Sequence, residues 1–196
     1  MCNVHSLYGE IFVELKQSSR VCLPSLKTLQ LEIGNVDVNS VDILLSACPI
    51  LETLELSFST ESSAELRVPS SLKSFQFTVE NDIEVCLEID TPGLKYLSLT
   101  NITFGNATSI GNLHNVEKAY LDVLSSSESE SVDPLLTLLQ ALSGIKRLVF
   151  RCYTAKVSEI FIILVYYIFH YIFKSFVLIL VSPLVVVVYV PKEIIR

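Results

Sequence analysis

The sequence is short of basic residues and of recognisable catalytic motifs. Its 196 residues hold 14 Lys and Arg against 21 Asp and Glu, a formal net charge of −7. A phosphate-binding surface needs clustered Lys and Arg, so we expect no nucleic acid partner. His5, His114 and His170 are isolated and fit no metal spacing. Because a P-loop, a G-x-G-x-x-G and a G-x-S-x-G are also missing, we expect no enzyme activity, cofactor or metal site.

Cysteines are few and widely spaced. They are odd in number, none forms a C-x-x-C pair, and they stand at Cys2, Cys22, Cys48, Cys86 and Cys152. This pattern excludes a disulfide framework and a zinc site and favours buried, reduced thiols. Met1 to Arg20 has no continuous apolar core, so we expect no signal peptide. Both features favour a cytoplasmic or nuclear protein.

What the sequence does have is one phrase, L-x-x-L-x-L, that recurs along the chain. Its six copies begin at Leu26, Leu51, Leu72, Leu94, Val116 and Ile145. The spacings of 25, 21, 22, 22 and 29 residues lie at or near the 20–29-residue period of leucine-rich repeats. Since side chains alternate across a strand, the last two apolar residues of each copy share one face. We therefore predict parallel strands that stack and bury this face in a shared core.

The segments between the copies differ in character. Val38 to Cys48 has apolar residues at helical spacing, and Asp133 to Leu142 is a second helical pattern with Pro at its first turn. Phe77 to Val85 and Cys86 to Ile89 are typical of extra strands or extended passes. The predicted fold is α/β: an irregular leucine-rich-repeat solenoid with a parallel β-sheet on its concave face and short helices or extended segments on its convex face.

The run from Leu23 to Leu56 resembles the repeat region of plant F-box/leucine-rich-repeat proteins of the F-box/FBD/LRR type. It carries L-P-S before the phrase, a helix ending in LLSACP, and LETLEL opening the next strand. Ile89 to Leu97 (IDTPGLKYL) is similar to another phrase of that family. The resemblance covers residues 23–152. It implies protein recognition, because in that family the repeats select a protein substrate for a cullin-type ubiquitin ligase.

The family's F-box is a separate N-terminal domain that docks onto the adaptor subunit of the ligase. Only 22 residues precede Leu23, and they resemble a degenerate repeat around Phe12-Val-Glu-Leu15. We therefore expect a repeat region without an F-box, a fragment that contacts the adaptor only if an F-box exists upstream. The predicted segments are a degenerate repeat over 1–22, the repeat domain over 23–152 and a hydrophobic tail over 153–196.

Candidate binding residues are the outward positions of the predicted sheet, because solenoids bind partners on their concave face. The candidate set is Gln30, Glu55, Gln76, Tyr96, Ser98, Lys118, Tyr120 and Arg147. Tyr and Arg dominate interface hot spots, so Tyr96, Tyr120 and Arg147 are the expected anchors. The expected partner is a segment of another protein. The alternative for each position is an ordinary solvated strand residue.

The C-terminal tail changes in composition after Lys156. Residues 160–181 meet the length of a membrane helix, interrupted by His170 and Lys174. One interpretation is a membrane anchor, which would make the chain a membrane-tethered leucine-rich-repeat scaffold. The other is a gene model that reads past an exon boundary, since Ile, Phe, Tyr, Val and Lys are favoured by AT-rich codons. A further alternative for the whole chain is a non-functional truncated product.

Overall fold

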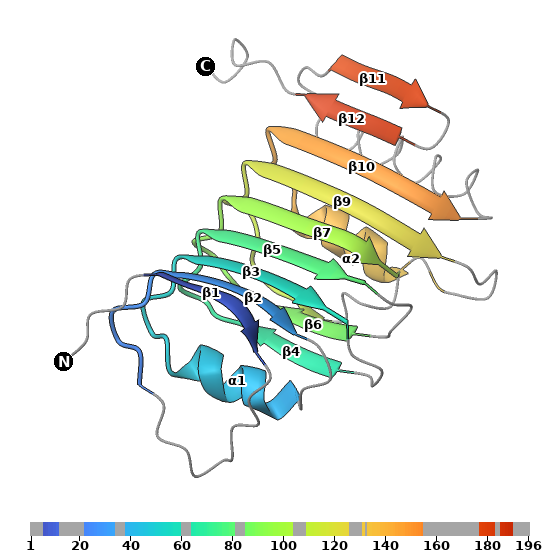
Figure 1. Cartoon of the computed structure of the whole chain (residues 1–196). Helices are drawn as coiled ribbons and strands as arrows, with labels where there is room; N and C mark the ends of the chain where they lie inside the picture. The colour runs from blue at the N-terminus through green and yellow to red at the C-terminus, as the bar shows by residue number, and fades with distance from the viewer. Residues whose placement is uncertain are drawn as a thin grey trace.

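The computed structural model of the chain describes residues 6–11, 22–33, 38–59, 64–80, 85–103, 109–125, 131, 133–154, 177–182 and 185–189. Within these residues a nine-stranded sheet runs along the whole molecule (Figure 1). In spatial order its strands are β1 (Ser6–Ile11), β2 (Thr28–Ile33), β3 (Thr53–Phe58), β5 (Ser74–Val79), β7 (Tyr96–Ile102), β9 (Lys118–Ser125), β10 (Arg147–Thr154), β12 (Val185–Tyr189) and β11 (Val177–Ser182). The strands from β1 to β10 are parallel, whereas β12 and β11 are antiparallel.

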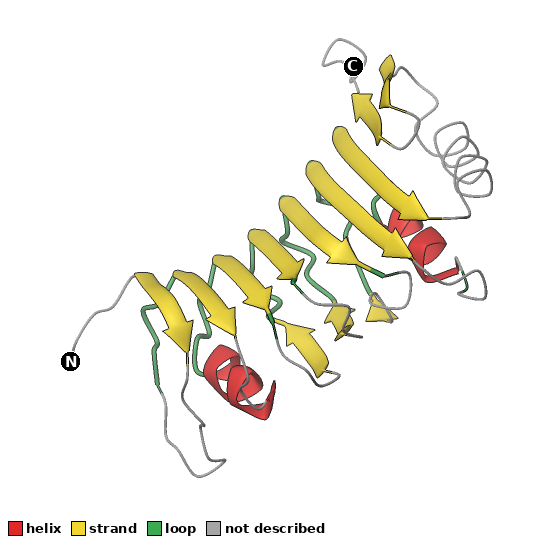
Figure 2. Ribbon diagram, turned by 45° about the vertical axis from the view of Figure 1, so that its right-hand side comes forward, coloured by secondary structure: helices red, strands yellow, loops and turns green. Residues whose placement is uncertain are grey.

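A second layer covers one face of this sheet (Figure 2). It consists of α1 (Val38–Ser46), α2 (Asp133–Ala141) and a small parallel sheet of β4 (Ala64–Val68), β6 (Val85–Ile89) and β8 (Ser109–Ile110). Helices occur where the connection between strands is long, and short strands occur where it is not. The predicted irregular solenoid, with both kinds of convex segment, is therefore confirmed.

The recurring phrase explains the core. In register, Leu54 on β3 is paired with Phe75 on β5, which is paired with Leu97 on β7, and all three side chains are fully buried. The residues that open the phrase, such as Leu51 and Leu72, are also fully buried. Each repeat thus adds a layer of apolar side chains to one continuous core, and that burial is the main stabilising contribution.

A tight turn precedes each phrase. The backbone N–H of Leu26 donates to the carbonyl of Leu23, and that of Leu51 donates to the carbonyl of Cys48, each at 3.2 Å. Pro24 and Pro49 occupy the second position of these turns, where the fixed φ of proline is favoured. The two prolines therefore help to form the turn that precedes each strand.

The first strand lies earlier than the sequence suggested. β1 pairs in parallel with β2, Leu7 facing Leu29 and Gly9 facing Leu31. The phrase expected there was Phe12-Val-Glu-Leu15, which lies outside the described residues. β1 is a weak repeat because Gly9 stands where the next strand has a leucine.

The end of the sheet departs from the repeat pattern. β12 pairs antiparallel with β10, and β11 pairs antiparallel with β12. Of the proposed membrane helix over 160–181, residues 160–176 lie outside the described residues, and Val177 to Val181 form part of a strand instead. Among the helices that the structure describes, none has the length and apolar character needed to span a bilayer.

Candidate partner-binding face

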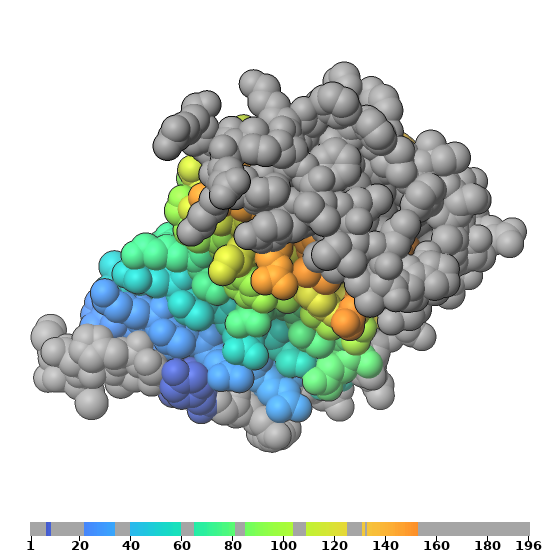
Figure 3. All heavy atoms as spheres, turned by 90° about the horizontal axis from the view of Figure 1, so that it is seen from above, coloured from blue at the N-terminus to red at the C-terminus, as the bar shows by residue number. Residues whose placement is uncertain are grey.

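The outward side of the main sheet is the face away from α1, α2 and the small sheet, and we call it the concave face. Seen from above, its repeats follow one another in chain order from blue to orange (Figure 3). The strand register aligns five of the predicted binding residues in a single row across five strands. This row is Gln30, Glu55, Gln76, Ser98 and Tyr120.

The other three predicted residues form a neighbouring row. Tyr96 on β7 pairs with Lys118 on β9, which pairs with Arg147 on β10. Toward the N-terminal end the same row continues through Ser74 and Thr53. All eight predicted residues therefore lie on the same face, in two adjacent rows.

Their exposure is unequal. Gln30, Lys118 and Arg147 are exposed, whereas Glu55, Gln76, Tyr96 and Tyr120 are half-buried. Ser98 is only 8% exposed, between Gln76 and Tyr120 in the row. The sequence predicts Ser98 as a contact residue, but a small side chain flanked by larger ones offers a partner little surface.

A cluster on β9 and β10 was not foreseen from the sequence. The Arg151 guanidinium lies over the Tyr120 ring, with Cζ 5.4 Å from the ring centre. The Tyr120 hydroxyl donates to Oδ2 of Asp122 at 3.2 Å. Asp122 is 7% exposed, and within the described part of the chain its Oδ1 has no hydrogen-bond partner. These contacts restrict the Tyr120 ring, so less side-chain entropy is lost when a partner binds.

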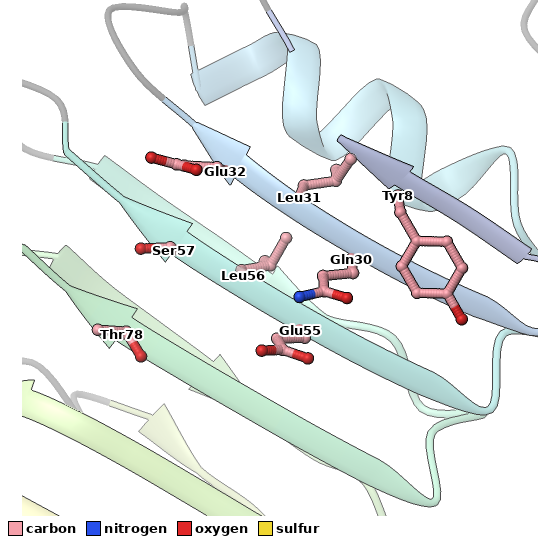
Figure 4. A pocket seen from close by; sticks show the side chains of 8 residues that line it. All are labelled: Tyr8, Gln30, Leu31, Glu32, Glu55, Leu56, Ser57 and Thr78. Atoms are coloured by element: carbon pink, nitrogen blue, oxygen red, sulfur yellow. The ribbon is translucent and has the colours of Figure 1, made fainter. Parts of the chain in front are cut away.

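A pocket of about 300 Å³ lies at the other end of the concave face (Figure 4). Its polar side chains come from four strands, and Leu31 and Leu56 complete the lining. The polar residues are Tyr8, Gln30, Glu32, Glu55, Ser57 and Thr78. Tyr8 is 63% exposed and was missed because β1 itself was missed. The pocket offers carboxylates, amide and hydroxyl groups beside an aromatic ring.

The charged residues that directly precede the strands of the main sheet, unlike those on the concave face, form ion pairs between successive repeats. The Glu52 carboxylate meets Lys27 at 3.4 Å and Lys73 at 3.0 Å. The Glu117 carboxylate meets Lys146 at 3.3 Å and Lys95 at 4.0 Å. Hydrogen bonds from Lys73 and Lys27 hold the pKa of Glu52 below its ordinary value. These exposed pairs join successive repeats and contribute little stability each.

The cysteines that the structure describes give no sign of a reactive centre. Cys48 and Cys152 are buried free thiols, while Cys22 is exposed. Burial raises the pKa of Cys48 to about 11, and burial together with the nearby charge of Asp122 raises the pKa of Cys152 to about 12. Because the thiolate is the nucleophile, both thiols are inert near neutral pH. Nor do the described residues gather three potential metal ligands anywhere.

Thiol labelling tests this arrangement. In the native chain at pH 8, a thiol reagent should modify Cys22 first and leave Cys48 and Cys152 unmodified until urea unfolds the repeats. Peptide mass spectrometry at timed intervals measures the order. Modification of Cys48 as fast as Cys22 would contradict the burial described above.

The chain resembles known proteins over most of its repeats. The family model described as "FBD-associated F-box protein At5g56370, LRR repeats" matches residues 4–128. The FBD-associated F-box protein At5g56370 of Arabidopsis thaliana is 34% identical over 134 residues, 65% of this chain and 29% of that protein. The F-box/FBD/LRR-repeat protein At1g80470 of the same plant is 30% identical over 162 residues, 77% of this chain and 34% of that protein.

The chain thus spans about a third of the length of these relatives. No solved structure matches it significantly. The family model covers more than half of the residues, including β1 to β9, and the strands inside it show the stacking that the recurring phrase predicts. The chain therefore belongs to the leucine-rich-repeat family of the FBD-associated F-box proteins.

Proposed function

We propose that the concave face binds a segment of another protein, as the substrate-recognition repeats of an F-box subunit of a cullin-type ubiquitin ligase do. The observation that carries this proposal is the row from Gln30 to Tyr120, which places side chains of five strands on one face. An extended protein segment crossing the strands meets every repeat at once. Repeat proteins bind their partners on surfaces of this kind.

A role in a ubiquitin ligase requires more than substrate binding by the repeats. Its support is the family, since both relatives described above are named as F-box proteins. In this proposal the repeats bind the protein substrate, and docking onto the ligase adaptor requires an F-box N-terminal to them. Co-precipitation with the adaptor by a chain extended upstream tests that step separately from substrate binding.

We also propose that the chain works in the cytoplasm or nucleus. The support is the burial of Cys48 and Cys152 as free thiols, which suits a reducing compartment. Fractionation of cells expressing the tagged chain tests this. Recovery in the soluble fraction is expected, and recovery with membranes would contradict the proposal and favour the membrane-tethered scaffold.

Substituting the three anchors tests the binding proposal. In capture from plant cell extract, the variant Tyr96→Ala/Tyr120→Ala/Arg147→Ala should bind about tenfold less partner than the wild-type chain. The reason is that tyrosine and arginine dominate interface hot spots. Quantitative mass spectrometry of the captured proteins measures the loss. Circular dichroism checks that the variant is folded.

The matched control carries Glu65→Ala/Arg67→Ala on β4, which belongs to the other layer. Glu65 and Arg67 are exposed, so both truncations should leave the fold and the captured proteins unchanged. Capture by the concave variant that matches both the wild type and this control would refute the proposal.

A further inference from the structure

The charges of the concave face are separated by sign along the solenoid. The carboxylates Glu32 and Glu55 lie on β2 and β3, at the N-terminal end. The cations Lys118, Arg147 and Arg151 lie on β9 and β10, at the C-terminal end. The outward residues of the strands between them are neutral: Ser74, Gln76, Thr78, Tyr96, Ser98 and Thr100. Asp122 on β9 is a carboxylate at the basic end, but it is 7% exposed and hydrogen-bonded to Tyr120. The accessible charges of the described face are therefore acidic at one end and basic at the other, with neutral residues between them.

Within the described part of the chain, Arg151 lies over the Tyr120 ring, and the other four of these accessible charges have no ionic partner. The carboxylates of Glu52 and Glu117 each bridge two lysines, but Glu32, Glu55, Lys118 and Arg147 form no ion pair there. The separation explains this difference, because the accessible carboxylates and cations of the face are several strands apart, whereas Asp122, which is in register with Arg151, is buried and accepts a hydrogen bond from Tyr120. Since like charges cluster at each end, the face gains from a partner that brings the complementary charges.

Each end has a recognisable chemistry. At the acidic end, the pocket of about 300 Å³ combines Glu32 and Glu55 with the exposed ring of Tyr8. Carboxylates beside an aromatic face suit the cationic head of a Lys or Arg side chain. At the basic end, the guanidinium of Arg151 is held over the Tyr120 ring and Arg147 is exposed. Guanidinium groups bind carboxylates with two parallel hydrogen bonds.

We infer that the partner of the concave face is an extended protein segment with a basic end and an acidic end, bound with its basic end at β2 and β3. This inference rests on the proposed function and adds the charge order of the partner. From β2 to β10 there are five steps between neighbouring strands. At about 4.8 Å a step the distance is about 24 Å, which about seven residues of extended chain span. The two charged ends of the segment are therefore about seven residues apart.

Selection from a random library tests the inference. A phage-displayed library of random dodecapeptides is selected on the full chain, and phage that also bind the Tyr96→Ala/Tyr120→Ala/Arg147→Ala variant are removed. The surviving peptides should carry Lys or Arg near one end and Asp or Glu near the other, about seven residues apart. Their affinity should fall as salt is added, because the contacts are ionic.

Charge reversal then assigns each end. Glu32→Lys/Glu55→Lys should weaken a selected peptide about tenfold, and replacing the basic residues of that peptide with Glu should restore most of the affinity. Arg147→Glu/Arg151→Glu should weaken binding of the peptide to a similar extent, and replacing the acidic residues of the peptide with Lys should restore most of the affinity. The exposed convex residues supply matched controls, since Glu65→Lys and Arg67→Glu should leave binding unchanged.

The outcomes separate the two proposals. The inference is supported by peptides that carry basic residues at one end and acidic residues at the other, and whose affinity is restored at each end by the matching charge reversal. Peptides that need the concave face but carry charges of one sign, or no order, would overturn it and leave the binding function standing. If no selected peptide depends on the concave face, the binding function fails and the inference fails with it.

Discussion

Replacing Phe77 with alanine is expected to lower the free energy of unfolding by about 3–5 kcal/mol, the cost of removing a phenylalanine from a well-packed core. The Phe77 ring is fully buried in β5. Its centre lies 5.5 Å from that of Phe58 and 6.1 Å from that of Phe75. Because a repeat contacts mainly its neighbours, the cavity weakens both interfaces of the central repeat at once.

Urea denaturation followed by circular dichroism measures this loss. The matched control is Thr78→Ala, the next residue of the same strand, whose side chain is on the concave face and half-buried. It should change the free energy of unfolding by less than about 1 kcal/mol. Equal losses for Phe77→Ala and Thr78→Ala would contradict the assignment of faces to β5.

Gly144→Ala is expected to have the second largest effect. Gly144 follows α2, and a Cβ at this position would overlap the backbone carbonyl oxygen of His114 in the preceding repeat. Backbone cannot move aside as a flexible side chain can, so the turn before β10 must shift. Shifts of this kind cost about 1–3 kcal/mol in well-packed structures.

Gly93→Ala is the matched control, since Gly93 also lies in the turn before a strand. A Cβ there would lie 3.5 Å from the carbonyl oxygen of Leu72, an ordinary van der Waals contact. We expect its midpoint in urea to stay within error of the wild type, or to rise slightly because alanine restricts the unfolded chain. A loss at Gly93 equal to that at Gly144 would show that close packing is not the reason.

The recurring phrase was sufficient to predict the central repeats because it determines both the burial of the side chains and the order of the strands. It gives the strand alternation that decides which side chains are buried, and the spacing that decides which strands are neighbours. From these, the row that joins Gln30, Glu55 and Gln76 could be predicted before any coordinates. The helices α1 and α2 could be predicted as well, because their apolar residues recur at helical spacing.

Other features depend on contacts that no local pattern encodes. β1 was missed because Gly9 breaks the phrase, although counting 22 residues back from Leu26 reaches Val4, which stands at the right distance before Leu7. The burial of Ser98 follows from the size of its neighbours in the row. The contact of Arg151 with Tyr120 likewise requires the register between β9 and β10. Alternation assigns a face to each residue, but it does not assign its partners.

The central claim is that a protein partner lies across the concave face, and site-specific photocrosslinking tests it most directly. A photoreactive phenylalanine analogue is placed at Gln76, at the middle of the row, and separately at Arg67 on the convex sheet. Each chain is irradiated with a captured partner, and crosslinked peptides are identified by mass spectrometry. Crosslinks from position 76 to one partner segment, and none from position 67, are the predicted result. Crosslinks from position 67 alone would contradict the account.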